Sequence, residues 1–311
     1  TLMVLAVLSL YFSVGTFDIA TLMKSSQTIP FAPYLFFVFL IAFAVKTPLF
    51  PFHAWLPDSY CQSSTAGTIL LAAVLSKAGI YGILRIGYGF FPTLLLSWSP
   101  ILLCFAVIGV LYGAFAAWGQ NDFKRLIAYS SLSHVNFILA GLFVYNEYTG
   151  TGSILQSVNH AVTVTGLFLV VGWLSERLDS TLMGSATGIA KYVPRLAWIT
   201  LFFVLSAVAL PGLNNFVSEV LILFGVFIYN PWFAGTLGLT VILSVIYSLR
   251  FYQSIYFGTA NSIQKNWVDL SFKEVCVTVP LIALILWLGI YPKPVLLEIE
   301  PFAKQLLGMN S

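Results

Sequence analysis

The chain has 311 residues, of which 59% are apolar and only 8% are charged, and its formal net charge is +3. A soluble domain carries roughly 25% charged residues, so this composition excludes a soluble globular fold, and the mean hydropathy of +0.94 indicates an integral membrane protein. The few charges form no basic run of the kind that binds nucleic acid, so we expect no nucleic-acid partner.

Apolar segments follow one another along the whole chain. A membrane-spanning helix needs ~20 mostly apolar residues, and by this rule the sequence predicts about nine spans. The predicted segments are residues 2–16, 31–55, 65–88, 98–118, 125–145, 152–174, 196–229, 232–257 and 275–290. No charged stretch precedes the short first segment, so we expect a chain that begins inside a larger membrane protein rather than a secretory signal peptide. The fold class predicted is an all-α integral membrane bundle.

Two lysines occupy positions that an apolar solvent disfavours. Lys46 follows a long apolar run, and Lys77 lies in the middle of the next segment. An ionised side chain at the centre of a membrane helix costs at least ~2.5–3.5 kcal/mol, so it normally faces a partner or a watery cavity. The alternative is a structural role, in which the lysine snorkels to the membrane surface or donates to backbone carbonyls. Together the two lysines predict a path for charge.

Prolines break two of the predicted spans. Pro48 and Pro51 follow Lys46, and Pro211 precedes Glu219. Proline removes a backbone donor and clashes with the preceding turn, so each helix is expected to break there. Broken backbone at membrane depth is stable only where protein or a water-filled cavity satisfies it.

The two breaks lie about five segments apart, which is typical of transporters built from inverted repeats. Three regions are therefore predicted. Residues 1–90 form the C-terminal part of a first five-helix repeat, with a broken helix at 31–57, and this repeat lacks its opening helices. Residues 98–257 form a complete second repeat with a broken helix at 196–229, and residues 258–311 hold the last spanning helix and a tail. The tail suits an interfacial helix or a contact with a neighbouring subunit.

The basic residues predict the orientation in the membrane. If the spans alternate, one side carries Lys124, Arg125, Arg177, Lys191, Arg195, Lys265 and Lys273, and the other carries Lys24, Arg85, Lys293 and Lys304. The positive-inside rule places the richer side in the cytoplasm or matrix, together with residues 55–58. We interpret His53 and Asp58 as a boundary motif and helix cap. Arg250 is expected to snorkel or to pair with a carboxylate on a neighbouring subunit.

Several motifs together resemble one family. They are VKTP at 45–48, HAWLPD at 53–58, TAGT at 65–68, LSK at 75–77, YGILR at 81–85, DFKRLIAYSSLSH at 122–134, LPG at 210–212 and FVSE at 216–219. This combination resembles the antiporter-like membrane subunits of respiratory complex I, and it is most similar to the family of NADH:quinone oxidoreductase subunit M and NADH dehydrogenase subunit 4. The resemblance covers nearly the whole chain.

The resemblance implies roles for five residues. Lys46 matches the lysine at the first break, Lys77 the lysine of the following helix, and Glu219 the carboxylate beside the second break, while His134 and His160 match histidines on the two helices between. In the family these groups form a hydrated polar axis at the membrane midplane, fed by half-channels. Family members also carry a glutamate on an earlier helix that pairs with the lysine at Lys46, and this sequence lacks that helix. The resemblance therefore implies a separate chain or a further segment that supplies it.

Elementary chemistry gives those residues an order. A desolvated lysine releases its proton more readily and a nearby carboxylate favours the charged form, so a moving carboxylate switches Lys46 between holding and releasing a proton. Lys77 then receives the proton, His134 and His160 relay it through ordered water, and Glu219 is the last carboxylate before release. The histidines fit equally well as interhelical hydrogen-bond partners.

Cofactor motifs are missing from the sequence. It has no GxGxxG after a strand, no P-loop and no Cys or His cluster with metal-ligand spacing, so we expect this chain to bind neither NADH, flavin, iron–sulfur cluster nor metal. Redox chemistry is then expected in other subunits. The leading prediction is a proton-translocating subunit of complex I, a translocase coupled to quinone reduction, in a bacterial or mitochondrial inner membrane. A subunit of a cation/proton antiporter or membrane-bound hydrogenase, and a structural membrane spacer, are the alternatives.

Overall fold

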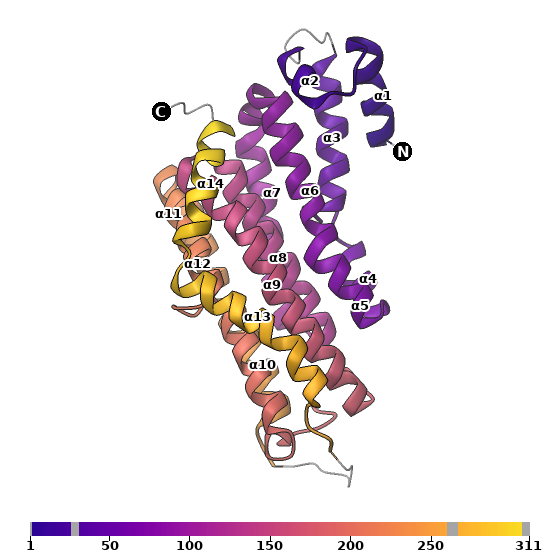
Figure 1. The fold of residues 1–311 in the computed structure, drawn as a ribbon, viewed down its shortest axis with the longest axis vertical. Coiled ribbons are helices and arrows are strands. Elements are labelled where there is room, and N and C mark those ends of the chain that lie inside the picture. The colour runs from indigo at the N-terminus through magenta and orange to yellow at the C-terminus, as the bar shows by residue number, and fades with distance from the viewer. Residues whose placement is uncertain (1, 26–30, 260–266, 307–311) are drawn as a thin grey trace.

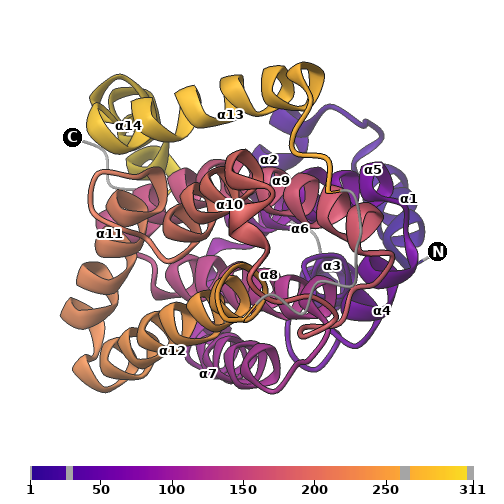
Figure 2. The same cartoon turned by 90° about the horizontal axis from the view of Figure 1, so that it is seen from below.

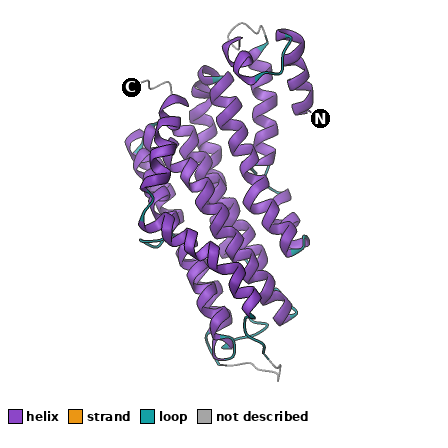
Figure 3. Ribbon diagram, in the orientation of Figure 1, coloured by secondary structure: helices purple, strands orange, loops and turns teal. Residues whose placement is uncertain are grey.

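The computed structural model describes residues 2–25, 31–259 and 267–306, and within these ranges every regular element is a helix (Figures 1 and 3). The first half of the chain holds α1 (Leu2–Val14), α2 (Ile19–Ser25), α3 (Ala32–Lys46), α4 (Trp55–Gln62), α5 (Thr65–Ile69), η2 (Leu70–Leu75), α6 (Ser76–Gly82), η3 (Ile83–Tyr88), α7 (Pro92–Trp118) and α8 (Phe123–Val144). The second half holds α9 (Glu147–Leu178), η4 (Ile189–Lys191), α10 (Pro194–Ala207), α11 (Asn214–Tyr229), α12 (Pro231–Tyr256), α13 (Phe272–Ile290) and α14 (Lys293–Leu306).

Six of these helical stretches are long and apolar enough to cross a membrane by length and composition: Thr65–Tyr88, α7, α8, α9, α12 and α13. Shorter apolar helices, α1, α3, α10 and α11, account for the remaining predicted segments in the described ranges. Each predicted span therefore contains one of these helices or two joined by a break. The all-helical membrane fold predicted from the sequence is confirmed.

Helix α8 lies in the middle of the bundle, between α7 and α9 (Figure 2). Of its most apolar 18-residue window, 94% is buried inside the protein, compared with 17% for α13. Polar side chains in this buried part of α8 are largely shielded from solvent and lipid and need partners within the bundle.

Both predicted helix breaks are present. Helix α3 ends at Lys46 and the chain becomes helical again at Trp55, while α10 ends at Ala207 and α11 begins at Asn214. The backbone carbonyls freed by the breaks are satisfied by side chains, as an apolar environment requires. The Trp55 indole donates to the Val45 carbonyl over 2.9 Å, and the Asn215 amide donates to the Ser206 carbonyl over 2.9 Å.

Asp58 has a different role from the helix cap that the sequence predicts. The N-cap of α4 is Ala54, and Asp58 lies one turn inside the helix, where its carboxylate pairs with the Arg125 guanidinium over 2.8 Å. The prediction failed because an ion-pair partner on α8 is invisible in the local sequence. The pair brings the start of α8 and residues 55–58 to the same end of the bundle, as predicted. Lys265, assigned to that end, lies outside the described residues.

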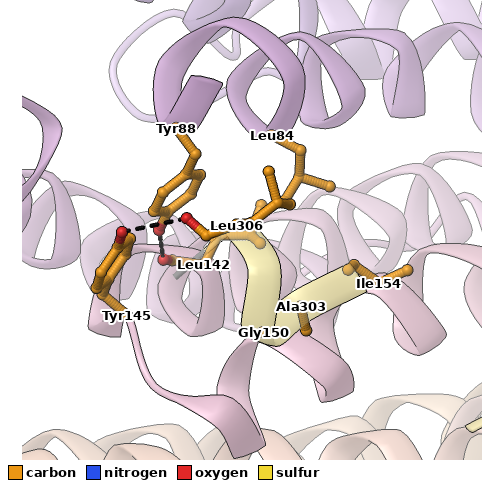
Figure 4. A pocket seen from close by; sticks show the side chains of 8 residues that line it. All are labelled: Leu84, Tyr88, Leu142, Tyr145, Gly150, Ile154, Ala303 and Leu306. Carbon is orange, nitrogen blue, oxygen red and sulfur yellow. Dashed lines mark hydrogen bonds between the residues drawn. The ribbon is translucent and has the colours of Figure 1, made fainter. Parts of the chain in front are cut away.

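Arg250 and the tail both find partners within this chain. The Arg250 guanidinium donates to the Trp118 carbonyl over 2.7 Å and to the Asn121 amide oxygen over 3.3 Å. Helix α14 packs on α9, and its last residue, Leu306, accepts a hydrogen bond from Tyr145 over 3.3 Å beside a small, almost wholly apolar cavity (Figure 4). A contact of the tail with a neighbouring subunit remains a prediction.

Two ion pairs that join α9 to later helices are expected to differ in strength. Arg177 binds both oxygens of Glu274 over 2.8 and 2.9 Å, and these side chains are only 15% and 20% exposed. Lys304 pairs with Glu147 over 2.8 Å, which raises the pKa of Lys304, but these side chains are 43% and 41% exposed. A partly buried, charge-assisted pair contributes roughly 1.5–3 kcal/mol, whereas solvent screening leaves an exposed pair with little net effect on stability. Arg177→Met should therefore lower the thermal unfolding temperature in detergent clearly more than Lys304→Met. Equal shifts would contradict this.

Candidate functional site: a buried polar axis

The site is built from polar stripes on three helices. On α9 the buried polar residues include Gln156, Asn159, His160 and Thr163, at the i, i+3, i+4 and i+7 spacing of one helix face. Helix α8 contributes Ser130, Ser131, Ser133 and His134, and α12 contributes Thr240, Ser244, Tyr247 and Ser248. Such stripes are expensive in an apolar environment, so their convergence indicates a built polar interior.

Lys77 marks one end of this interior. It is the second residue of α6, which follows η2, a π-helical stretch whose wider turn leaves backbone carbonyls free for other donors. The ammonium group donates to the Ala72 carbonyl over 2.7 Å and contacts the His160 Nδ1 atom over 2.6 Å. Two positive charges at this separation repel strongly in a dry interior. The pair of Lys77 and His160 is therefore more stable with one positive charge than with two.

His160 and His134 face one another next to a cavity. Their ring centroids lie 5.7 Å apart, and both residues line a cavity together with Ser130, Ser131 and Asn215. The cavity holds roughly one water, and its polar lining offers the several partners that a buried water needs.

Glu219 lies at the other end. Its carboxylate oxygen is 3.4 Å from the His134 Nδ1 atom and accepts a hydrogen bond from the Gln156 amide over 3.2 Å. The residue is only 4% exposed, and a second small cavity lies against it and His134. We call the series Lys77, His160, His134 and Glu219 the buried polar axis.

Lys46 is not part of this axis. It is the last residue of α3, its side chain is exposed, and it has neither a hydrogen bond nor an ion pair with any residue that the structure describes. The structure thus brings together four of the five residues predicted from the sequence and leaves Lys46 on the surface.

Sequence reasoning missed the supporting network around the second break. Asn159 donates to the Asn214 carbonyl over 2.7 Å and to Ser218 over 2.9 Å, and Ser206 donates to the Asn214 side chain over 2.8 Å. These contacts fix the broken backbone beneath Glu219. The regular spacing of polar residues on α9 is the signal that predicts them, because a spanning helix rarely carries four polar residues on one face.

Comparison with known proteins gives the fold a family. Residues 1–246 match the family model of the transmembrane domain of NADH:quinone oxidoreductases and Mrp antiporters. Subunit M of the NADH-quinone oxidoreductase from Mycobacterium tuberculosis is 42% identical over 268 residues, which are 86% of this chain and 48% of that protein. The chain thus spans about half the length of this relative.

Solved structures agree with the family match. A chain of respiratory complex I from Thermus thermophilus superposes with a TM-score of 0.90 and 30% identity over 100% of this chain and 66% of the other. A chain of the Mrp complex from a Dietzia species superposes with a TM-score of 0.88 over 98% of this chain and 65% of the other, at 19% identity, and so shares the fold. The converging polar interior therefore sits in a known architecture, and the chain belongs to the NADH:quinone oxidoreductase/Mrp antiporter transmembrane family.

Proposed function

We propose that this chain is a proton-translocating membrane-arm subunit of an NADH:quinone oxidoreductase, with redox chemistry confined to other subunits. The observation that supports it best is the buried polar axis, in which titratable groups succeed one another within hydrogen-bond reach or across a cavity. The names of the relatives support it too, because they are those of subunits of such complexes. An energy-transducing inner membrane, bacterial or mitochondrial, is the corresponding location.

The proposed transfer starts at the Lys77–His160 pair. The ammonium donates to Nδ1 of a neutral His160 over 2.6 Å, and moving the proton along this line leaves a neutral lysine and an imidazolium. Water in the adjoining cavity then accepts the proton from His160 and passes it to His134. His134 delivers it to the Glu219 carboxylate, which is 3.4 Å away.

Lys46 is proposed to supply protons to Lys77, the first residue of the buried polar axis, from its position on the surface of this chain. A lysine at membrane depth needs a counter-charge, and none of the described residues supplies one. We infer that a carboxylate from another membrane-arm subunit or a further segment meets Lys46. Motion of that carboxylate switches the lysine between its two protonation states and couples this chain to events elsewhere in the complex.

A cation/proton antiporter is the second candidate, because the shared fold with the Mrp complex supports it. A membrane-bound hydrogenase subunit belongs to the same class of alternatives. Transport that depends on sodium ions favours the antiporter, whereas unchanged proton translocation in sodium-free medium favours the oxidoreductase. A purely structural spacer would not need Lys77, His160 and Glu219, whose burial costs free energy.

The test compares two glutamates in the assembled complex. Glu219→Gln removes the terminal proton acceptor while keeping its shape, and we expect proton translocation to fall roughly 100-fold, at the lower end of the range of general acid–base contributions. Glu176→Gln, an exposed position on α9, is the matched control and should leave translocation unchanged. Normal translocation in the Glu219→Gln complex, with the full amount of the subunit present, would overturn the proposed function.

A further inference from the structure

Two cavities adjoin His134. The first is lined by His134, His160 and Ser130, among others, and the second by His134, Glu219 and Tyr247, among others. His134 is a lining residue of both. Its imidazole is therefore one connection between the water sites on the two sides.

A pair of hydroxyl groups makes a second connection between the same cavities. Ser130 lines the first cavity and Tyr247 lines the second, and their hydroxyl oxygens are hydrogen-bonded over 2.9 Å. Tyr247 is completely buried and Ser130 is only 4% exposed, so neither hydroxyl has another route to solvent. The pair joins α8 to α12, a helix that carries none of the five site residues predicted from the sequence.

A second buried tyrosine of α12 makes an ordinary hydrogen bond between helices, here to α10. Tyr256 and Thr200 are hydrogen-bonded over 2.6 Å, and both are also completely or almost completely buried. Neither of them lines the two cavities around His134. The position between two polar cavities therefore distinguishes the Ser130–Tyr247 pair from a hydrogen bond that only holds helices together.

We propose that the Ser130–Tyr247 pair is a second proton connection, parallel to His134, between the His160 side and the Glu219 side of the buried polar axis. This inference rests on the proposed function of the chain. In one passage, water in the first cavity takes a proton from protonated His160 and gives one to the Ser130 oxygen, as the Ser130 hydrogen moves to the Tyr247 oxygen. The Tyr247 hydrogen leaves to water or the Glu219 carboxylate, so one proton enters, one leaves, and both hydroxyls stay neutral. Rotation of the two O–H bonds restores the starting arrangement.

Parallel connections have a characteristic signature in a double-mutant series. Removing either one leaves the other open, so each single variant keeps much of the activity. Removing both leaves no titratable or hydroxyl route between the cavities, so the combined loss exceeds the product of the single losses.

The experiment measures proton translocation and quinone reduction in membrane vesicles that contain the assembled complex with the full-length subunit. We expect Tyr247→Phe to lower translocation about twofold and His134→Gln about threefold, whereas the double variant should lose at least about twentyfold. Ser130→Ala should reproduce Tyr247→Phe, and Ser130→Thr, which keeps the hydroxyl, should restore activity. Tyr256→Phe is the matched control, with full translocation expected.

Three outcomes decide the matter. A double variant no worse than His134→Gln alone overturns the parallel connection. A loss in Tyr256→Phe equal to that in Tyr247→Phe also overturns it, because burial rather than position then explains the effect. Lys77→Met, included in the same series, tests the proposed function separately from the parallel connection. If Lys77→Met blocks translocation but the double variant shows no extra loss, only the parallel connection is overturned. If Lys77→Met translocates normally, the proposed function itself fails.

Discussion

Lys77→Met is expected to abolish proton translocation by the assembled complex, with a loss of at least ~100-fold. The substitution keeps the length and apolar stem of the side chain and removes the group that exchanges a proton with His160 over 2.6 Å. Because Lys77 opens the buried polar axis, no described side chain replaces it at this point. Proton uptake by vesicles during quinone reduction measures the effect, and immunoblotting confirms that the subunit is present.

The arginine variant separates charge from proton transfer. Arginine stays protonated under all physiological conditions, so Lys77→Arg keeps the positive charge but cannot release a proton. We expect it to translocate as poorly as Lys77→Met. Lys191→Met, at an exposed turn outside the axis, is the control and should behave as the unmodified chain. Normal activity in Lys77→Arg would show that only the charge matters.

Gly113→Leu is expected to have the largest effect on stability. A Cβ atom at Gly113 would lie 2.8 Å from the Ser133 backbone nitrogen, and one at Gly109 would lie 2.3 Å from the Asn136 amide oxygen. These two glycines, four residues apart, let α7 approach the central α8 closely, as small residues commonly do between membrane helices. Overpacking typically costs about 1–3 kcal/mol, and a clash with backbone, which cannot rotate away, is expected near or above about 3 kcal/mol.

The consequence extends to function, since His134 directly follows Ser133 on the displaced helix. Gly113→Leu should therefore lower both the unfolding temperature in detergent and proton translocation. Gly235→Leu is the matched control: that glycine is also helical, but a Cβ atom added there would meet no other atom within 4 Å. A Gly113→Leu protein as stable as the Gly235→Leu protein would contradict the close packing of α7 and α8.

The helix breaks were predictable because proline acts through local backbone chemistry. Pro48 and Pro211 identify the two interruptions from sequence alone, and Lys46 and Glu219 stand beside them. Lys77 was equally visible as a charge inside an apolar segment. These signals need no knowledge of tertiary structure, since each depends on a residue type that its own segment disfavours.

Contacts across the bundle could not be predicted in this way. Lys77 meets His160 across 83 positions of sequence, and Ser130 meets Tyr247 across 117, so the pairing depends on helix rotation and register. The π-helical turns before and after α6 set that rotation, and no residue type specifies them. Tyr247 was overlooked because a tyrosine in a spanning helix is ordinarily a packing or interfacial residue.

The central claim is that Lys77, His160, His134 and Glu219 form a continuous path for protons. A structure of the assembled complex at a resolution that shows ordered water tests it most directly. Our account predicts water in both cavities around His134, with every step from Lys77 to Glu219 within about 3.5 Å. Aliphatic side chains filling either cavity, with no water between His160 and His134, would contradict it.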